Sequence, residues 1–214
     1  MVALGGFILW LGWFGFNGGS VTSLDDGKLG GVLLNTHLSA CAGAIGALAF
    51  MRLSARPVLM TSTVNGSLCG LASITAGAAS MTPAFALLTG LVGGVLCTWG
   101  AERLQRWRVD DAVDAVAVHG IGGVWGLFAV GLFHQAGLFD PQRIGVQLLG
   151  ITASFLWAFP MAWLLFKAID RFGGLRVPSL NEQRGLDDTE HHEVGYPEFQ
   201  ASPGQLRMGV ERGE

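Results

Sequence analysis

The sequence predicts an all-α membrane protein, a polytopic bundle of about six transmembrane helices. Half of the 214 residues are hydrophobic and only 14% are charged, whereas a soluble domain usually carries about a quarter charged residues. The charges cluster between long uncharged stretches, and the 33 glycines allow helices to approach one another closely in lipid. The net charge of −3 decides nothing, because orientation depends on where lysine and arginine lie.

The apolar segments define the expected elements. Each reaches the length of about 20 residues that spans a bilayer. In chain order they are 2–20, 29–51, 58–78, 84–101, 112–133 and 144–168. We therefore expect residues 1–168 to form a transmembrane helical region. The polar, proline- and glycine-punctuated residues 169–214 are expected to form a solvent-exposed tail.

Basic residues mark one side of the predicted bundle. They follow the second, fourth and sixth segments, as Arg52, Arg56, Arg103, Arg106, Arg108, Lys167, Arg171 and Arg176, whereas the alternate loops carry only Lys28 and Arg143. Because positive loops stay on the cytoplasmic side, both the N-terminus and the tail are expected in the cytoplasm. The first segment begins almost at Met1 with no signal peptide and no basic lead-in. From this we expect that the chain begins in the middle of something larger.

His119 stands mid-way through the apolar fifth segment, 112–133. An ionisable side chain at bilayer depth costs several kcal/mol unless it faces protein or a wet path. Two interpretations stay open: an imidazole bonded to another helix, or a functional group beside a permeating molecule. The neighbouring Gly120, Gly122 and Gly123 remove side chains around the imidazole. Something must therefore approach it closely, either a helix or a permeant.

Acidic residues open the same segment. Asp110 and Asp111 are expected to stabilise the helix start, where carboxylates are favourable. Asp114 lies one turn further in, so we expect it to hold neighbouring backbone or a pore wall rather than contact substrate. The spacings Gly66/Gly70, Gly90/Gly94 and Gly122/Gly126 predict close helix contacts.

The remaining histidines and the cysteines favour structural roles. His37 follows Asn35-Thr36, which favours an interhelical hydrogen-bond cluster over the alternative of a pore role, and His134 is expected to be solvated at a helix end. His191 and His192 lack further ligands at metal-binding spacing. The cysteines at 41, 69 and 97 fall inside apolar segments and also lack such spacing, so we expect packing residues and no metal site.

The first segment ends in the run Trp13-Phe14-Gly15-Phe16-Asn17-Gly18-Gly19-Ser20. An aromatic pair near a helix end is typical of an interfacial belt. Aromatic faces followed by Asn17 and Ser20 are equally suited to a small cation, since rings supply cation–π attraction and hydroxyls supply acceptors.

Together these motifs resemble the ammonium transporter family, the Amt/MEP/Rh group. The matching runs, in the family's order, are GWFGFNGGS (12–20), Asn35-Thr36, GLASITAG (70–77), VDDAVDAVAVHGIGGVWG (109–126) and the tail pattern GLRV…GLDDTEHHEVGYPEFQ (174–177, 185–200). The resemblance extends to about Gln200. It implies an eleven-helix fold built from two inverted five-helix repeats and a last long helix, of which this chain is similar to helices six to eleven. In the tail, His192 stands where the family commonly has glycine.

The resemblance also implies a function. Family members pass ammonia through a narrow apolar pore in each protomer of a trimer, after ammonium loses its proton beside facing histidines. His119 corresponds to the second histidine, Phe16 to a gate phenylalanine and Ser20 to a vestibule hydroxyl. Trp13 corresponds to a pore-wall aromatic and Thr75 to a threonine at a helix break. Asn17 and Asp114 are expected to support the pore. The first histidine, the other gate phenylalanine and the vestibule tryptophan belong to helices that have no counterpart here.

Two hypotheses follow. The first is a transporter of ammonium or ammonia in the plasma (inner) membrane that needs a matching N-terminal half. The alternative is a non-transporting membrane subunit, or an ammonium-sensing partner of a full-length transporter. A decayed, inactive gene product is a third possibility. The tail is expected to couple protomers and meet PII signalling proteins. No enzymatic activity, cofactor or nucleic-acid partner is expected, since no nucleophile–base pair is spaced for catalysis.

Overall fold

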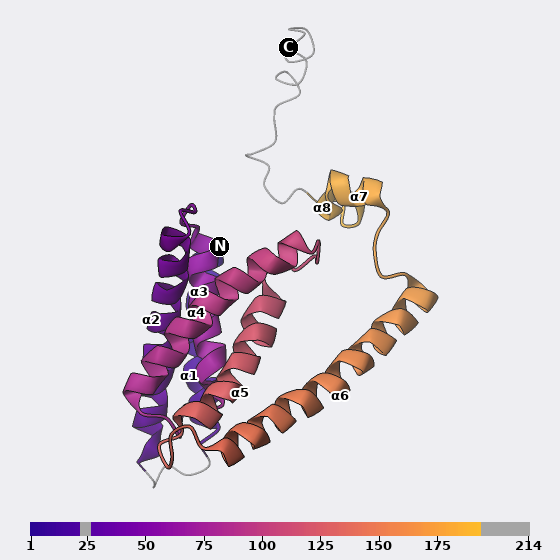
Figure 1. Cartoon of the computed structure of the whole chain (residues 1–214). Helices are drawn as coiled ribbons and strands as arrows, with labels where there is room; N and C mark the ends of the chain where they lie inside the picture. Colours follow the sequence, from indigo (N-terminus) through magenta and orange to yellow (C-terminus); the bar gives the residue numbers. More distant parts are fainter. Residues whose placement is uncertain (22–26, 194–214) are drawn as a thin grey trace. The chain divides into compact units, whose positions relative to one another are not determined.

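The computed structural model describes residues 1–21 and 27–193, and the regular elements within these ranges are all helices (Figure 1). They are α1 (Val2–Gly19), α2 (Lys28–Leu53), α3 (Met60–Thr75), α4 (Pro83–Arg106), η1 (Val116–Ile121), α5 (Gly122–Phe133), α6 (Pro141–Gly173), α7 (Ser179–Arg184) and α8 (Leu186–Thr189). The chain divides into two compact units, Met1–Leu156 and Trp157–Glu214. The first unit holds the helix bundle.

The bundle is built around α2, α3 and α4, which all contact one another, while α1 packs on α2 and α3, and α5 on α3 and α4. Successive helices from α1 to α5 reverse direction (Figure 1). A proline and a glycine stand at positions that suit the starts of two helices. Pro83 occupies the first turn of α4, where its missing N–H costs nothing. Gly27 precedes α2 with a φ of 64°, a conformation that glycine adopts without strain.

Glycines bring these helices together, as the three predicted pairs require. A Cβ atom on Gly94 would overlap the carbonyl oxygen of Gly43, and one on Gly90 would overlap that of Ser39. The pairs Gly66/Gly70 and Gly122/Gly126 are equally close to neighbouring helices: a Cβ on Gly66 would lie 2.8 Å from the Gly43 oxygen and one on Gly122 2.6 Å from the Cys69 Sγ. The prediction of close helix contacts is confirmed.

The interior is consequently made of small side chains. The largest ones that are fully buried are Leu71 and Ile74, followed by threonine, cysteine and serine residues. Cys69 and Cys97 are buried in one cluster with Ala117 and Val118, and Cys41 is half-buried. Small side chains and backbone contacts replace the hydrophobic driving force that lipid does not supply.

Five helical stretches are long and apolar enough to cross a membrane: α1, α2, α4, Val116–Phe133 and α6. The third predicted segment, 58–78, is helical only over the 16 residues of α3, which is shorter than the other five. Past Thr75 the chain makes turns, and Asn35 of α2 holds them by donating to the carbonyl oxygens of Ala78 (2.9 Å) and Met81 (2.8 Å). Non-helical backbone inside a membrane protein needs such internal partners.

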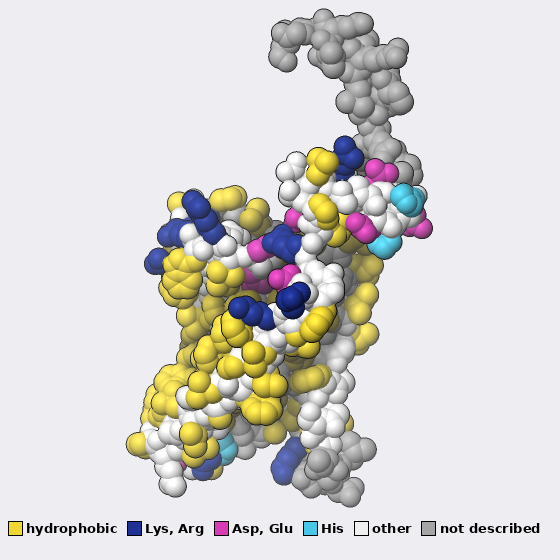
Figure 2. Space-filling view, turned by 90° about the vertical axis from the view of Figure 1, so that its right-hand side faces the viewer, with side chains coloured by type: hydrophobic (Ala, Val, Ile, Leu, Met, Phe, Trp, Pro, Cys, Tyr) yellow, Lys and Arg dark blue, Asp and Glu magenta, His cyan; other side chains and the backbone are white. Residues whose placement is uncertain are grey.

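Charged side chains gather at one end of the bundle, where α2 and α4 end and α3 begins (Figure 2). There the Arg56 guanidinium forms an ion pair with the Glu102 carboxylate. Between the two ends, the face of the bundle in Figure 2 shows mostly hydrophobic and uncharged side chains, and further Lys and Arg side chains lie at the lower end. The predicted alternation of basic and non-basic loops therefore corresponds to two different ends of one bundle.

The second unit, described to residue 193, holds the end of α6 and the short helices α7 and α8. The Arg176 guanidinium and the Glu182 carboxylate form an ion pair at 2.8 Å. His192 has a φ of 53°, in the region that favours glycine, which fits its place where the similar family has glycine. The remainder of the tail motif, 194–200, lies outside the described residues.

Candidate functional site

Trp13 connects α1 to the end of α3. Its indole Nε1 donates to the Oγ1 of Thr75 at 2.9 Å, and the same hydroxyl donates to the Leu71 carbonyl oxygen at 2.8 Å. Thr75 is the last residue of α3. A hydroxyl that both accepts and donates is fully used, so the indole is held at the point where the helix stops.

The imidazole of His119 stacks on this indole. The two rings are nearly parallel, tilted by 6°, with their centroids 6.2 Å apart. Phe16 lies about one helical turn from Trp13 along α1, with the two ring centroids 5.8 Å apart and the ring planes tilted by 51°. Phe16, Trp13 and His119 therefore form one aromatic row. The phenylalanine ring is 62% exposed, and His119 is exposed as well.

His119 lies on η1, a π-helical turn over Val116–Ile121 that continues directly into α5. Such turns are rare and occur often at functional sites. The glycines near His119 serve two different purposes: one allows close contact with a helix, and the others leave open space. Gly122 faces α3, whereas a Cβ on Gly123 would meet nothing within 4 Å and one on Gly120 would meet only Val116 of the same turn. The imidazole thus has open space beside it on the first unit.

The start of this segment differs from the prediction. Asp114 lies just before the helical residues, with a φ of 56°, rather than one turn inside a helix. Its Oδ2 accepts from the Asn65 Nδ2 at 2.9 Å, which ties the segment to α3. The Asp111 Oδ2 accepts from the backbone N–H groups of Val116 (2.9 Å) and Ala117 (3.3 Å). The helix-start role predicted for Asp111 is therefore confirmed.

Asn17 and Ser20, from the same run as Trp13 and Phe16, lie apart from the row. Asn17 is 4% exposed, and its Nδ2 donates to the Thr36 Oγ1 of α2 at 2.9 Å. Its Oδ1 has no hydrogen-bond partner. The Ser20 hydroxyl is exposed and donates to the Phe16 carbonyl oxygen at 2.8 Å. One residue of the run thus joins two helices, and the other caps the end of its own helix.

His37 is not in the hydrogen-bond cluster expected for it. Each residue of an α-helix is rotated about 100° from the one before, so His37 faces away from the buried Asn35 and Thr36. Its exposed imidazole instead contacts the rings of Trp10 (5.4 Å between centroids) and Phe14 (6.1 Å) on α1. The expectation was wrong because sequence neighbours on a helix do not share a face.

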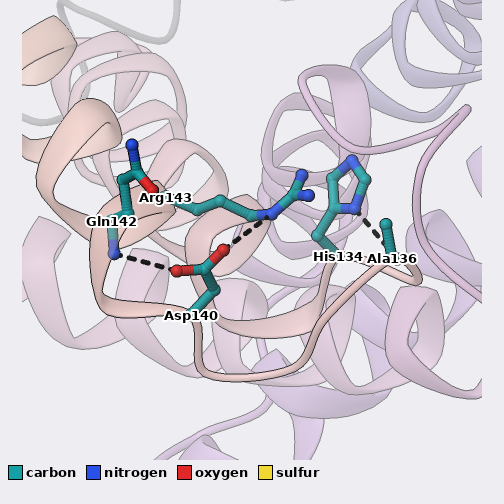
Figure 3. A network of polar contacts seen from close by, with 5 residues as sticks. All are labelled: His134, Ala136, Asp140, Gln142 and Arg143. Carbon is teal, nitrogen blue, oxygen red and sulfur yellow. Dashed lines mark hydrogen bonds and ion pairs between the residues drawn. The ribbon is translucent and has the colours of Figure 1, made fainter.

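His134 ends α5 at the opposite end of the bundle from the charged loops. Its Nδ1 accepts from the Ala136 N–H at 3.1 Å, while the Asp140 carboxylate accepts from the Gln142 N–H (2.9 Å) and the Arg143 Nε (3.2 Å) (Figure 3). His134 is half-buried rather than fully solvated. An open cavity of about 520 Å³ is lined by His134, Asp140, Gln142 and Arg143 among others, and no residue of the aromatic row lines it.

Sequence reasoning missed Asn65 and the proximity of Cys41 to His37. Asn65 was a polar residue inside the apolar 58–78 segment, which was a usable signal for a buried partner of Asp114. Cys41 lies with its Sγ 3.7 Å from the His37 Nε2, four residues along α2. That spacing places both side chains on one helix face.

Comparison with known proteins gives consistent matches. The model of the Ammonium Transporter Family matches residues 1–196. The chain is 36% identical to "Ammonium transporter Amt2" of Archaeoglobus fulgidus, over 98% of this chain and 48% of that protein. It is 37% identical to "Ammonium transporter" of Bacillus subtilis, over 90% of this chain and 50% of that protein. The chain therefore spans about half the length of these relatives.

Solved structures agree on the fold. The structure titled "Sensor Amt Protein" superposes with a TM-score of 0.80 at 36% identity, covering 88% of this chain and 48% of that one. Candida albicans Mep2 superposes with a TM-score of 0.74 at 26% identity, covering 84% and 43%. Most of this chain therefore shares the fold of somewhat less than half of each of these proteins.

Proposed function

Because the chain belongs to the ammonium transporter family, we propose that it conducts ammonium or ammonia across a membrane along the aromatic row of Phe16, Trp13 and His119. The protein is an integral membrane protein, as its long apolar helices and its family require. The substrate is proposed from the names of its relatives, of which it spans about half.

The observation that carries the proposal is the stack of His119 on Trp13, continued by Phe16. Aromatic faces attract a small cation. A bare ammonium ion is costly to strip of water, whereas neutral ammonia crosses an apolar path cheaply. An imidazole has both a donor and an acceptor nitrogen, so His119 is suited to take or relay the proton between these two species.

The other predicted residues receive supporting roles. Ser20 supplies a hydroxyl near the outer end of α1, beyond Phe16. Thr75 fixes the Trp13 indole through its hydrogen bond. Asn17 and Asp114 join α1 to α2 and the η1 segment to α3, respectively. In this proposal these two hold the pore wall in place and do not contact the permeant.

We further propose that transport needs a second helical half. Phe16 and His119 are exposed on the described bundle, and an open surface is no pore. In inverted-repeat transporters the substrate site lies at the interface of the two repeats. A complementary half supplied by another polypeptide segment would cover the row and complete the wall.

The proposed setting is the plasma (inner) membrane, with residues 1–168 as the membrane region and residues 169–214 as a cytoplasmic tail. Clustering of basic loops at one end of the bundle supports this orientation. Assembly as a trimer and contact of the tail with a PII protein are proposals from the family resemblance. The alternative of a non-transporting subunit is not favoured, since the named relatives are transporters. We propose no catalysed reaction.

Uptake of labelled methylammonium tests the proposal. The chain is expressed in cells that lack ammonium uptake, alone and together with the N-terminal five helices of the Archaeoglobus relative. We expect uptake only in the combined cells, and its loss in His119→Ala. His134→Ala is the matched control, because His134 lies outside the aromatic row. Uptake by the chain alone would remove the need for a second half. Absence of uptake with both halves present in the membrane would overturn the transport proposal.

A further inference from the structure

The face of α2 that carries His37 and Cys41 has no part in the proposed transport path. The two side chains stand four residues apart, and the Cys41 Sγ lies 3.7 Å from the His37 Nε2. His37 is exposed and Cys41 is half-buried. Both atoms are soft or borderline metal ligands, and both already point to the same place.

The imidazole is held in this orientation by α1. The rings of Trp10 and Phe14 lie against it, with centroids at 5.4 Å and 6.1 Å and planes tilted by 46° and 27°. Aromatic contacts of this kind fix a ring that would otherwise rotate freely. The His37 Nε2 is therefore preorganised toward the thiol before any ligand arrives.

The number of ligands selects the kind of metal. Within the described residues, no group of three or more His, Cys, Asp or Glu side chains is placed to hold an ion. Structural zinc takes four protein ligands, so a lone Cys–His pair does not suit it. Thiolate ligands favour Cu(I) among the available metals. A soft monovalent ion with a linear or bent two-ligand shell needs only this pair.

The net charge of the metal complex also favours a monovalent ion. A monovalent ion bound by one thiolate and one neutral imidazole gives a complex with no net charge. A divalent ion in the same place would leave a net positive charge on an apolar helix surface, which is costly at bilayer depth.

We propose that His37 and Cys41 form a two-ligand binding site for a soft monovalent metal ion, Cu(I) or its analogue Ag(I). The Cys41 Sγ and the His37 Nε2 are 3.7 Å apart, so a small change in the side-chain torsions opens the gap enough for one ion to bond both atoms. On binding, the Cys41 thiol proton passes to the carrier ligand that delivers the metal, the sulfur bonds the metal, and the His37 Nε2 donates its lone pair. No electron is transferred, because the metal enters and stays as a monovalent ion.

Cys69 and Cys97 are the competing ligands in this chain, since they lie buried in one cluster. A metal held by them would have two sulfur ligands and no nitrogen. Their seclusion between α3 and α4 contrasts with the accessible His37. The composition of the metal's first shell therefore distinguishes the two sites without any substitution.

The test uses the full 214-residue chain in nanodiscs, titrated with Cu(I) under anaerobic conditions against a competing chelator. We expect one equivalent to bind, with at least tenfold weaker binding in His37→Phe and in Cys41→Ser. The phenylalanine keeps an aromatic ring between Trp10 and Phe14. Cys97→Ser is the thiol control and is expected to bind as the parent does.

X-ray absorption on the parent protein loaded with Cu(I) provides an independent readout if a variant fails to fold. We expect one sulfur and one nitrogen in the first shell. A two-sulfur shell, or unchanged affinity in a folded His37→Phe, would overturn the proposal. Neither result bears on the transport proposal, which does not involve this helix face.

Discussion

The Trp13 indole and the His119 imidazole lie parallel, with a tilt of 6° and 6.2 Å between ring centroids. The indole is held in turn by the hydroxyl of Thr75 at the end of α3. The orientation of His119 thus depends on a hydrogen bond that His119 does not make. This dependence can be measured by changing the threonine alone.

Thr75→Val is expected to lower the free energy of unfolding by about 1–3 kcal/mol, because it leaves the half-buried indole N–H without an acceptor. It should also reduce methylammonium uptake by the assembled transporter. Thermal unfolding in detergent and the uptake assay measure the two effects. Thr63→Val is the control, since its hydroxyl donates to the Leu59 carbonyl of its own helical segment. If the two variants unfold and transport alike, the hydrogen bond from the Trp13 indole to Thr75 contributes neither to stability nor to uptake.

Gly94→Ala should destabilise the bundle, because its new Cβ would overlap the Gly43 carbonyl oxygen and force α2 and α4 apart. Overpacking of this kind costs about 1–3 kcal/mol. In Gly150→Ala the new Cβ meets nothing within 4 Å, so helix propensity should make that variant neutral or slightly stabilising. Chemical denaturation followed by tryptophan fluorescence compares them. A stable Gly94→Ala would mean that the helices are not as close as described.

Asp114 and Asn65 should be energetically coupled through the hydrogen bond of 2.9 Å between them. A double-mutant cycle of Asp114→Ala and Asn65→Ala is expected to give a coupling of about 1.5–3 kcal/mol, as for other bonds to charged groups. Asp114→Asn should be milder than Asp114→Ala, since asparagine keeps an acceptor and tolerates the φ of 56°. Additive single effects in the cycle would exclude the coupling.

The proposed orientation predicts opposite labelling of the two ends of the bundle. Cysteines introduced as Ser54→Cys and Leu138→Cys would lie in a basic and a non-basic loop, respectively, and both positions are exposed. In intact cells a membrane-impermeant thiol reagent should label the residue 138 variant and not the residue 54 variant. Both should react after the cells are broken. The reverse pattern in intact cells would invert the proposed topology.

The helices themselves were predictable, because a membrane-spanning helix consists of a long run of apolar residues. The close approach of α4 to a neighbouring helix was predictable too, because Gly90 and Gly94 lie four residues apart on one helix face and allow close backbone contact. The early end of α3 followed only from the family resemblance, which places a helix break at Thr75, and not from the residues themselves. The residues after Thr75 remain apolar, and what stops the helix there is Asn35 of another helix, which binds the Ala78 and Met81 carbonyls.

The site was predictable only in part for a similar reason. Trp13, Phe16 and His119 are each conspicuous in the sequence, but their meeting depends on how α1 and η1 both pack against α3. The left-handed conformation of Asp114 delays the helix start, and no local residue such as glycine announces it. The prediction for His37 was wrong because it grouped His37 with Asn35 and Thr36 by adjacency in the sequence. Successive residues of an α-helix are rotated by about 100°, so adjacent side chains point in different directions.

The π-helical turn at Val116–Ile121 has a consequence for how this region tolerates changes in length. A π-turn accommodates about one residue more than an α-turn, so the side chains before and after it are out of phase with a regular α-helix by about 100°. A one-residue deletion there would give an unbroken α-helix with better local geometry. It would also rotate the upstream residues against α5, with His119 among those displaced. Substitutions preserve this phase, but insertions and deletions do not. The placement of His119 therefore depends on the number of residues in the turn as well as on their identity.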